Sequence, residues 1–200
     1  MTKIDAKTVK QLRDLTGAPM MDCKSALSET GGDIEKARDV LRKRGQQVAD
    51  KASGREVSEG LVYGYQHHNG KLGVMVEIVC ETDFVAMNED FKAFCHGVAL
   101  TVTAFNPAFL DKNSIAPEAI EKEQAFFTEQ AKEQMAGKPD SVIEKAITGR
   151  MEKWIAEQTL MDKPYVPDDS KTVEQVRTEL VGKIGENIQV RRFMRMELGG

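Results

Sequence analysis

Apolar residues recur at helical spacing in three short stretches at the start of the chain. The first stretch carries them three residues apart: Val9, Leu12 and Leu15. Asp33 precedes the third stretch, where its carboxylate can cap a helix by accepting hydrogen bonds from free N–H groups. Glycines separate the stretches, and Gly45 is expected to end the third. The pattern predicts a small three-helix bundle over residues 1–45.

A polar segment of mixed charge, residues 46–58, is interpreted as a linker. Beyond it, Asn69-Gly70 lies between two β-prone segments, which is the strongest short-range signal for a β-hairpin because both residues tolerate positive φ. Residues 188–198 alternate between apolar and polar and predict a third strand. Three antiparallel strands would leave exposed edges and one open face.

Helical periodicity returns between the hairpin and the last strand. One helix is predicted from about Asn88 to Asn106-Pro107, which ends it. Two further helices, on either side of Gly137-Lys138-Pro139, form a predicted antiparallel helical hairpin over about residues 117–160. The predicted fold is α+β: an N-terminal bundle, then a core of residues 59–200 in which helices pack on a three-stranded antiparallel sheet and the helical hairpin protrudes.

Composition narrows the class of protein. The chain has 200 residues, of which 30% are charged and 40% hydrophobic, and a net charge of −4. The acidic balance disfavours direct nucleic-acid binding, and no apolar run is long enough to span a bilayer. The first five residues, Met1 to Asp5, show no targeting signal. We therefore predict a cytoplasmic protein that binds neither membrane nor nucleic acid.

Metal and cofactor chemistry finds little support. The three cysteines, Cys23, Cys80 and Cys95, are odd in number and widely spaced, so we interpret them as buried apolar residues. His67 and His68 are adjacent, and neighbours on a strand point to opposite faces, so they are not expected to share one metal ion. No cofactor and no metal centre are predicted.

The stretch Thr82-Asp83-Phe84-Val85 lies where a strand gives way to a helix, and corners of this kind carry function more often than the elements that they join. Taken by composition alone, Phe84 would pack into the core and Asp83 would cap a turn.

Three separated motifs resemble the elongation factor Ts family, in order and spacing and over nearly the whole length. They are Leu12-Arg13-Asp14-Leu15-Thr16-Gly17-Ala18-Pro19-Met20-Met21-Asp22-Cys23-Lys24-Ser25-Ala26-Leu27, then Gly70-Lys71-Leu72-Gly73-Val74-Met75-Val76-Glu77 with Glu81-Thr82-Asp83-Phe84-Val85-Ala86, and Gly185-Glu186-Asn187-Ile188-Gln189-Val190-Arg191-Arg192-Phe193. The chain resembles the short, single-core bacterial form. The resemblance implies guanine-nucleotide exchange on elongation factor Tu, without covalent chemistry by the factor itself and with an N-terminal bundle like that of ubiquitin-associated domains.

The resemblance also implies three sets of partner-binding residues. Thr82, Asp83, Phe84 and Val85 would disturb the partner's magnesium and phosphate site. Lys10, Arg13, Met20 and Met21 would contact its nucleotide-binding domain. Leu72 and Gly73 would contact a second domain. Independently of the resemblance, Met20 and Met21 are successive helical positions, so at least one of them is expected to be exposed.

Two features qualify the correspondence with the family. Met87 stands where a basic residue is expected, which affects one peripheral polar contact. Longer members carry two copies of the core and this chain carries one, so we expect two chains to pair as a homodimer, giving a two-plus-two complex with the partner.

Two other classes of function remain open from the residues. One is an adaptor in which residues 1–45 alone bind a partner without any effect on nucleotides. The other is an enzyme in which Asp83 acts with nearby carboxylates: Glu81, Glu89 or Asp90. The second has no histidine or nucleophile at the same place, and Glu89 and Asp90 also suit the first turn of a helix.

Overall fold

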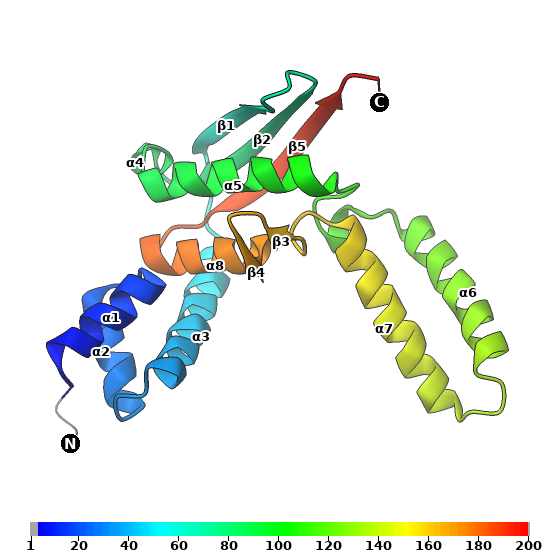
Figure 1. The fold of residues 1–200 in the computed structure, drawn as a ribbon, viewed down its shortest axis with the longest axis horizontal. Helices are drawn as coiled ribbons and strands as arrows, with labels where there is room; N and C mark the ends of the chain where they lie inside the picture. Colours follow the sequence, from blue (N-terminus) through cyan, green and yellow to red (C-terminus); the bar gives the residue numbers. More distant parts are fainter. Residues whose placement is uncertain (1–3, 200) are drawn as a thin grey trace. The chain divides into compact units, whose positions relative to one another are not determined.

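The computed structural model describes residues 4–199. Residues 1–3 and 200, which begin and end the two predicted domains, lie outside the described part, as do three of the five N-terminal residues inspected for a targeting signal. Helices and a three-stranded antiparallel sheet make up the fold, which confirms the predicted α+β class (Figure 1). The described chain divides into two compact units, residues 4–62, 77–95 and 175–190, and residues 63–76, 96–174 and 191–199.

The first unit begins with the predicted helical bundle. Its helices are α1 (Ala6–Thr16), α2 (Met20–Glu29) and α3 (Ile34–Ala52). They enclose a small core of fully buried side chains: Leu12, Cys23, Ala26, Leu27 and Ala37. The predicted cap at Asp33 is present, since its side chain accepts from the Lys36 N–H at 3.1 Å, and at the end of α1 the N–H of Gly17 (φ 67°) donates to the Arg13 carbonyl at 2.7 Å.

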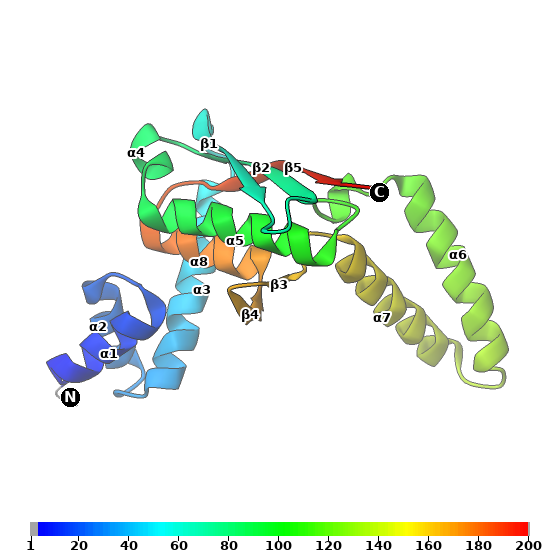
Figure 2. The same cartoon turned by 45° about the horizontal axis from the view of Figure 1, so that its top comes forward.

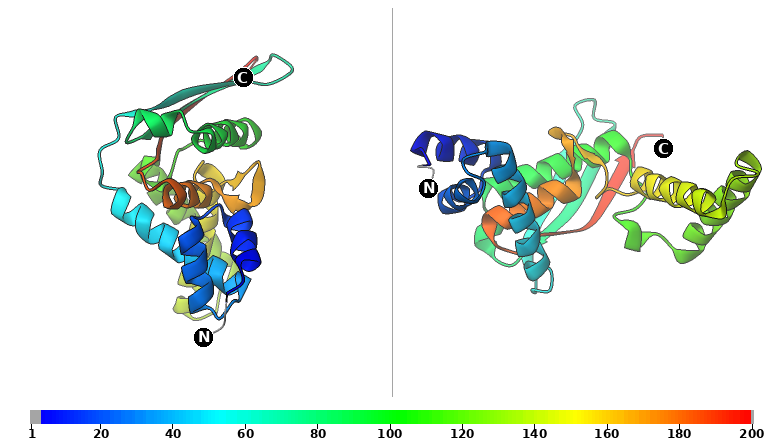
Figure 3. Two further views of the ribbon diagram at one scale, coloured as in Figure 1. Left: turned by 90° about the vertical axis from the view of Figure 1, so that its left-hand side faces the viewer. Right: turned by 90° about the horizontal axis from the view of Figure 1, so that it is seen from below.

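The prediction that Gly45 ends the third helix is wrong, because α3 continues through it to Ala52. Gly45 instead lies where α3 meets α8 (Val173–Ile184), which crosses it (Figure 3). A Cβ added to Gly182 would lie only 2.9 Å from the Cα of Gly45. The absence of a side chain at Gly45 therefore allows two helices to approach closely, and the residue does not end a helix.

The sheet has the strand order β1-β2-β5, with β1 Glu59–Gln66, β2 Leu72–Cys80 and β5 Gln189–Glu197. The predicted hairpin at Asn69-Gly70 is confirmed: the His67 N–H donates to the Leu72 carbonyl at 2.9 Å, and Gly70 has φ 68°. Side chains on β2 alternate, and those that face inward are fully or almost fully buried: Val74, Val76 and Ile78.

Helix α5 (Glu89–Phe105) follows the first two strands and supplies much of the core. It begins where the sequence predicts, and the Asn88 side chain caps it by accepting from the Asp90 N–H at 2.8 Å. It ends at Asn106, a non-glycine residue with φ 44°, directly before Pro107. Between β2 and α5 the chain forms a separate single turn, α4 (Asp83–Ala86), which Figure 2 shows and the sequence pattern did not predict.

The second unit contains the helical hairpin, built from α6 (Pro117–Gln134) and α7 (Asp140–Gln158) and preceded by the short 3-10 helix η1 (Lys112–Ser114). Figure 2 shows α6 and α7 side by side, as the sequence predicts. Few of their side chains are buried, and Arg150 joins them by donating to the side chains of Gln130 (2.7 Å) and Gln134 (2.9 Å). Polar contacts therefore contribute much of the hairpin's cohesion.

After α7 the chain forms a small second sheet that the sequence pattern did not predict, β3 (Pro164–Tyr165) with β4 (Asp168–Thr172). The ring of Tyr165 occupies the space that a Cβ would need at Gly97, so this sheet packs directly on α5. Within residues 4–199, no helix combines the length and the apolar character that crossing a membrane requires.

Candidate functional site

Phe84 points away from the protein: 84% of it is exposed. The local sequence explains why. The Thr82 hydroxyl accepts from the Val85 N–H at 3.4 Å and starts α4, while Val85 and Ala86 are buried and anchor the turn. The interpretation in which Phe84 packs into the core is therefore wrong. So is the cap assigned there to Asp83, because the preceding residue, Thr82, is the cap.

Asp83 and Met87 flank this aromatic side chain and are exposed as well, Met87 to 70%. We call Thr82–Met87 the corner. Of the four site residues predicted here, two face solvent (Asp83 and Phe84), whereas Thr82 shapes the turn and Val85 anchors it. An exposed phenylalanine beside a carboxylate and a methionine is a surface that a partner can cover.

The corner is clamped from a distant part of the chain. The carboxylate of Glu186 accepts the Thr82 N–H at 3.1 Å and the Thr82 hydroxyl at 2.7 Å. Charge-assisted bonds of this kind are stronger than neutral ones, so they hold the turn that presents Phe84. Sequence reasoning did not find Glu186 as a site residue, although it lies in the third motif quoted above.

A second network joins the strand end before the corner to the segment after α3. The Glu81 carboxylate accepts the Asn187 N–H at 2.6 Å and pairs with Arg55 at 3.3 Å. Asn187 is 1% exposed, and its amide donates to the carbonyls of Arg55 (2.9 Å) and Ser53 (3.4 Å). Glu81 is thus committed to structure.

The carboxylates proposed for an enzyme are separately engaged. Glu81 belongs to the network just described, Glu89 pairs with Lys92 at 2.9 Å, and Asp90 pairs with Lys183 at 2.7 Å. Among residues 4–199 no group of three or more histidine, cysteine, aspartate or glutamate side chains is arranged to hold a metal ion. Nothing at the corner gathers these groups around a reacting atom.

Cys80 lies directly behind the corner, where its thiol donates to the Thr82 carbonyl at 3.2 Å. Burial raises the pKa of this thiol to about 11, and the negative charge of Glu186 acts in the same direction. Burial also raises the pKa of Cys95, to about 12. Both residues, like Cys23, are free and buried, as the sequence predicts. They are therefore poor nucleophiles at neutral pH.

The N-terminal site residues belong to α1 and to the start of α2, and all four are exposed. Lys10 and Arg13 are exposed, as are Met20 (45%) and Met21 (71%). The expectation that at least one of the two methionines is exposed is confirmed. Leu15, which was assigned to the helix's apolar stripe, is 56% exposed, but two positions after Arg13 it points to nearly the opposite side of α1. We call Lys10, Arg13, Met20 and Met21 the N-terminal surface.

The two hairpin residues behave differently from each other. Leu72 is 8% exposed, so its side chain belongs to the core. Gly73 is half-buried, and a Cβ there would meet only the Tyr65 carbonyl at 4.0 Å. Because the fold leaves room for a side chain at Gly73, its glycine is not explained by internal crowding.

Two of the three histidines, His67 and His96, lie against tyrosine side chains. The Tyr63 hydroxyl is 3.0 Å from His96 Nδ1, and the Tyr65 hydroxyl is 3.1 Å from His67 Nδ1. The rings of His67 and His68 are 4.2 Å apart, so the expectation that they point to opposite faces is wrong. The reason is that β1 ends at Gln66 and both histidines belong to the turn.

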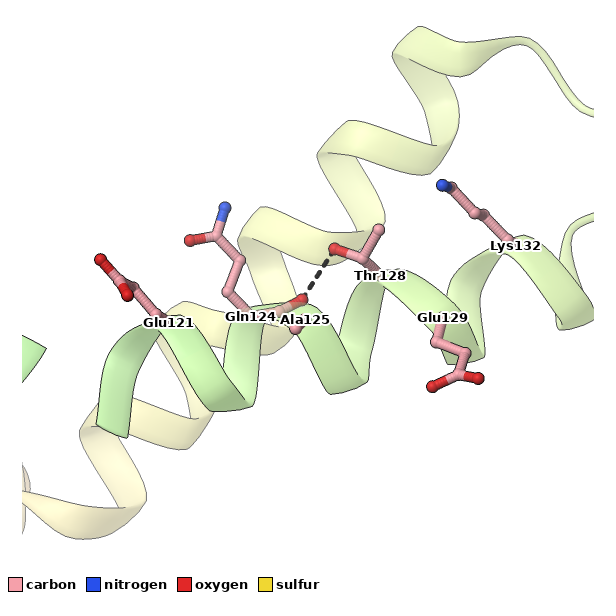
Figure 4. A pocket seen from close by; sticks show the side chains of 6 residues that line it. All are labelled: Glu121, Gln124, Ala125, Thr128, Glu129 and Lys132. Carbon is pink, nitrogen blue, oxygen red and sulfur yellow. Dashed lines mark hydrogen bonds between the residues drawn. The ribbon is translucent and has the colours of Figure 1, made fainter. Parts of the chain in front are cut away.

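A shallow hollow lies along α6 (Figure 4). Its lining residues are Glu121, Gln124, Ala125, Thr128, Glu129 and Lys132. All of them come from one helix, and the Thr128 hydroxyl donates to the backbone of that same helix at 2.7 Å. No second element brings polar groups to the hollow, so it does not compare with the corner as a functional site.

Fold and site together define the class: an α+β protein with an N-terminal helical bundle and a helical hairpin, which presents exposed apolar side chains at a clamped corner. The chain belongs to the elongation factor Ts family. The family model described as Elongation factor TS matches residues 8–179, a span that includes most of the bundle, the corner and the helical hairpin. This is a family of translation elongation factors, which confirms the resemblance inferred from the sequence.

Relatives named elongation factor Ts match the chain along its whole length. The protein from Solidesulfovibrio magneticus is 48% identical over 199 residues, covering 100% of this chain and 98% of the relative. That from Desulforamulus reducens is 47% identical over 199 residues (100% and 91%). That from Fervidobacterium nodosum is 45% identical over 197 residues (98% and 99%). Their lengths agree with the short bacterial form.

Proposed function

We propose that this protein is a guanine-nucleotide exchange factor for elongation factor Tu. It binds the GDP-bound GTPase in the cytoplasm, disturbs its magnesium and phosphate site, and promotes release of GDP. The protein acts as a binding partner and not as an enzyme. The single observation that carries the proposal is the exposure of Phe84, 84%, on a turn that Thr82 caps, Glu186 clamps and the buried Val85 and Ala86 anchor.

The proposed mechanism is differential binding. GDP is held in such a GTPase by backbone groups and a magnesium ion. Phe84 enters the partner beside that site, and Asp83 fixes the corner against it by hydrogen bonds or by pairing with a cation. The corner fits the open, metal-poor state better than the closed state, so it shifts the partner toward the open state. Because coupling is reciprocal, GDP weakens the factor as much as the factor weakens GDP.

The magnitudes require more than one contact. A thousandfold faster release corresponds to about 4 kcal/mol of differential interaction. Burying one phenylalanine supplies about 1.5–3 kcal/mol. The N-terminal surface and the turn at Leu72 and Gly73 therefore contribute to holding the complex. In this proposal residues 1–45 form the N-terminal partner-binding domain, and residues 46–58, which begin as the continuation of α3, connect it to the core domain of residues 59–200.

We also propose that the protein is a homodimer, which binds two partner molecules. Successive residues on a strand face opposite sides, so Met75 lies on the side of β2 away from the buried Val74 and Val76, and the neighbouring strand β5 carries two more exposed methionines. Met75 is 51% exposed, Met194 61% and Met196 71%. A second copy offers the same apolar face, which satisfies the self-complementarity of a twofold interface. We call these three residues the open sheet face.

The function is tested by release of a fluorescent GDP analogue from elongation factor Tu. Acceleration by the native protein that depends on Phe84 supports exchange through the corner. Binding of residues 1–45 without any acceleration of release by the full chain would support the adaptor function instead.

A further inference from the structure

Lys183, near the end of α8, contacts two segments: the turn between α1 and α2, next to the N-terminal surface, and the start of α5, next to the corner. Its side chain lies across Gly17, in the turn that leads into Met20: a Cβ added to Gly17 would meet Lys183 Cδ at 3.5 Å, Cε at 3.6 Å and Nζ at 3.6 Å. Its Nζ pairs with the Asp90 carboxylate at 2.7 Å. Asp90 is in the first turn of α5, which directly follows the corner.

The residues after Lys183 hold the same neighbourhood. Glu186 clamps Thr82, and Asn187 bonds to Glu81 and to the end of the α3 segment. One short stretch of chain thus contacts the N-terminal bundle, the corner and the segment between them. Each of these contacts lies within the first unit.

Helices α3 and α8 approach each other closely at Gly45 and Gly182, and neither residue has a side chain that could interlock with the other helix. A contact between two glycines fixes how close the helices lie, and side chains around it must fix their mutual angle. Lys183 is placed to do so, since it reaches from α8 to both the α1–α2 turn and α5.

We propose that Lys183 is a positioning residue, which holds the N-terminal surface and the corner in the arrangement that lets both engage one partner molecule. The expected effect of Lys183 on nucleotide exchange rests on the proposed function. Its effect on the arrangement of the two surfaces does not depend on that function. Two surfaces on one chain reinforce each other only when they are presented at the right separation and angle. Loss of the Lys183 contact lowers the fraction of molecules in that arrangement.

A structural role alone predicts a different outcome. The side chains of Lys183 and Asp90 are 37% and 47% exposed, and ion pairs of this exposure contribute little to folding stability. Their loss should leave the melting temperature nearly unchanged while it alters the geometry of binding. Stability and binding can therefore be separated experimentally.

The first test compares Lys183→Met with Lys92→Met in full-length protein. Methionine keeps most of the stem that covers Gly17 and removes the charge, and Lys92 provides a matched control because it also pairs with a carboxylate on α5 (Glu89, 2.9 Å). For Lys183→Met we expect the concentration of factor that gives half-maximal GDP release to rise ~3–10-fold with the maximal rate unchanged. Asp90→Asn should do the same, and the charge swap Lys183→Glu with Asp90→Lys should recover most of the loss.

The second test needs no partner. Spin labels at Met21→Cys and Met87→Cys, which replace exposed residues, report the distance distribution between the two surfaces. We expect Lys183→Met to broaden this distribution and Lys92→Met to leave it unchanged. An unchanged distribution in Lys183→Met overturns the proposal, as does an equal rise in half-saturation for Lys92→Met. If native protein does not accelerate release, the proposed function fails, and the distance measurement alone decides the positioning role.

Discussion

The carboxylate of Glu186 accepts two hydrogen bonds from Thr82, a residue 104 positions earlier in the chain, at 3.1 Å from the backbone N–H and 2.7 Å from the hydroxyl. The turn that carries Phe84 is thereby fixed at its first residue. Phe84 itself has little contact with the rest of the chain, since 84% of it is exposed. Rigid support below an exposed aromatic side chain is the arrangement that a wedge needs, because little freedom is lost when it enters a partner.

Replacing Glu186 with alanine should therefore affect both stability and exchange. Two partly buried donors would lose a charged acceptor, so we expect the free energy of unfolding to fall by about 1–3 kcal/mol and exchange to slow. Glu186→Gln should cost less, because an amide oxygen can still accept one bond. Urea unfolding and GDP-release rates measure the two effects. Glu89→Ala, at an 89% exposed carboxylate, is the control and should change stability little; equal effects at the two positions would contradict the clamp.

The contact between Gly182 and Gly45 leads to a second prediction. A Cβ at Gly182 would lie 2.9 Å from the Cα of Gly45, so Gly182→Ala forces α3 and α8 apart and should destabilise the protein by about 1–3 kcal/mol. Gly149→Ala is the matched control: it lies within α7, nothing approaches its Cβ position within 4 Å, and alanine should stabilise by up to about 1 kcal/mol. Thermal unfolding of both variants gives the comparison, and a neutral Gly182→Ala would refute the close contact.

The buried thiols give the protein a predictable loss of stability in alkali. Folding raises the pKa of Cys80 to about 11 and that of Cys95 to about 12, from an ordinary value of 9.0. The folded state thus retains protons that the unfolded state loses, and the stability linked to these groups is complete below pH 9 and is lost as pH rises through 11 to 12. Unfolding measured from pH 8 to 11 should show a steeper decline for native protein than for Cys95→Ala. Equal slopes would contradict the assignment.

The proposed dimer depends on the open sheet face. Introducing charge there through Met194→Lys with Met196→Lys should separate two copies, because a buried unpaired ammonium is costly at an interface. Both side chains are exposed in the single chain, to 61% and 71%, so folding itself should be retained. Sedimentation at micromolar concentration would show a dimer for native protein and for the control Phe126→Lys, and a monomer for the double variant. If native protein sediments as a monomer at this concentration, the proposed homodimer is wrong.

Periodicity and turn chemistry predicted most of the fold correctly. The three N-terminal helices, the Asn69-Gly70 hairpin, the helical hairpin and the last strand were found because each has a local signal in spacing or in caps. The end of the third helix was predicted wrongly at Gly45 because a glycine after basic residues resembles a helix end. Its role in the structure depends on Gly182, which is far away in sequence. The small sheet formed by β3 and β4 was missed because its short, polar strands lack alternation.

The candidate site was predictable only in part for a similar reason. The family resemblance pointed to Phe84, but composition alone favoured a buried side chain. What exposes it is the Thr82 cap together with the burial of Val85 and Ala86, which depends on tertiary packing. Glu186 and Lys183 act through contacts between distant segments, so no local pattern marks them. Leu72 shows the opposite case, a residue suggested by resemblance whose side chain lies in the core.

The central claim is that the exposed Phe84 drives nucleotide exchange. Its most direct test is the rate of fluorescent GDP release from elongation factor Tu with native protein, with Phe84→Ala, and with Phe126→Ala as a control at another exposed phenylalanine (54%). We predict rapid release with native protein and with Phe126→Ala. For Phe84→Ala we predict a reduction of ~10- to 100-fold, from the loss of about 1.5–3 kcal/mol of apolar burial, with an unchanged melting temperature. Native rates from a stably folded Phe84→Ala would contradict the claim and place the wedge elsewhere.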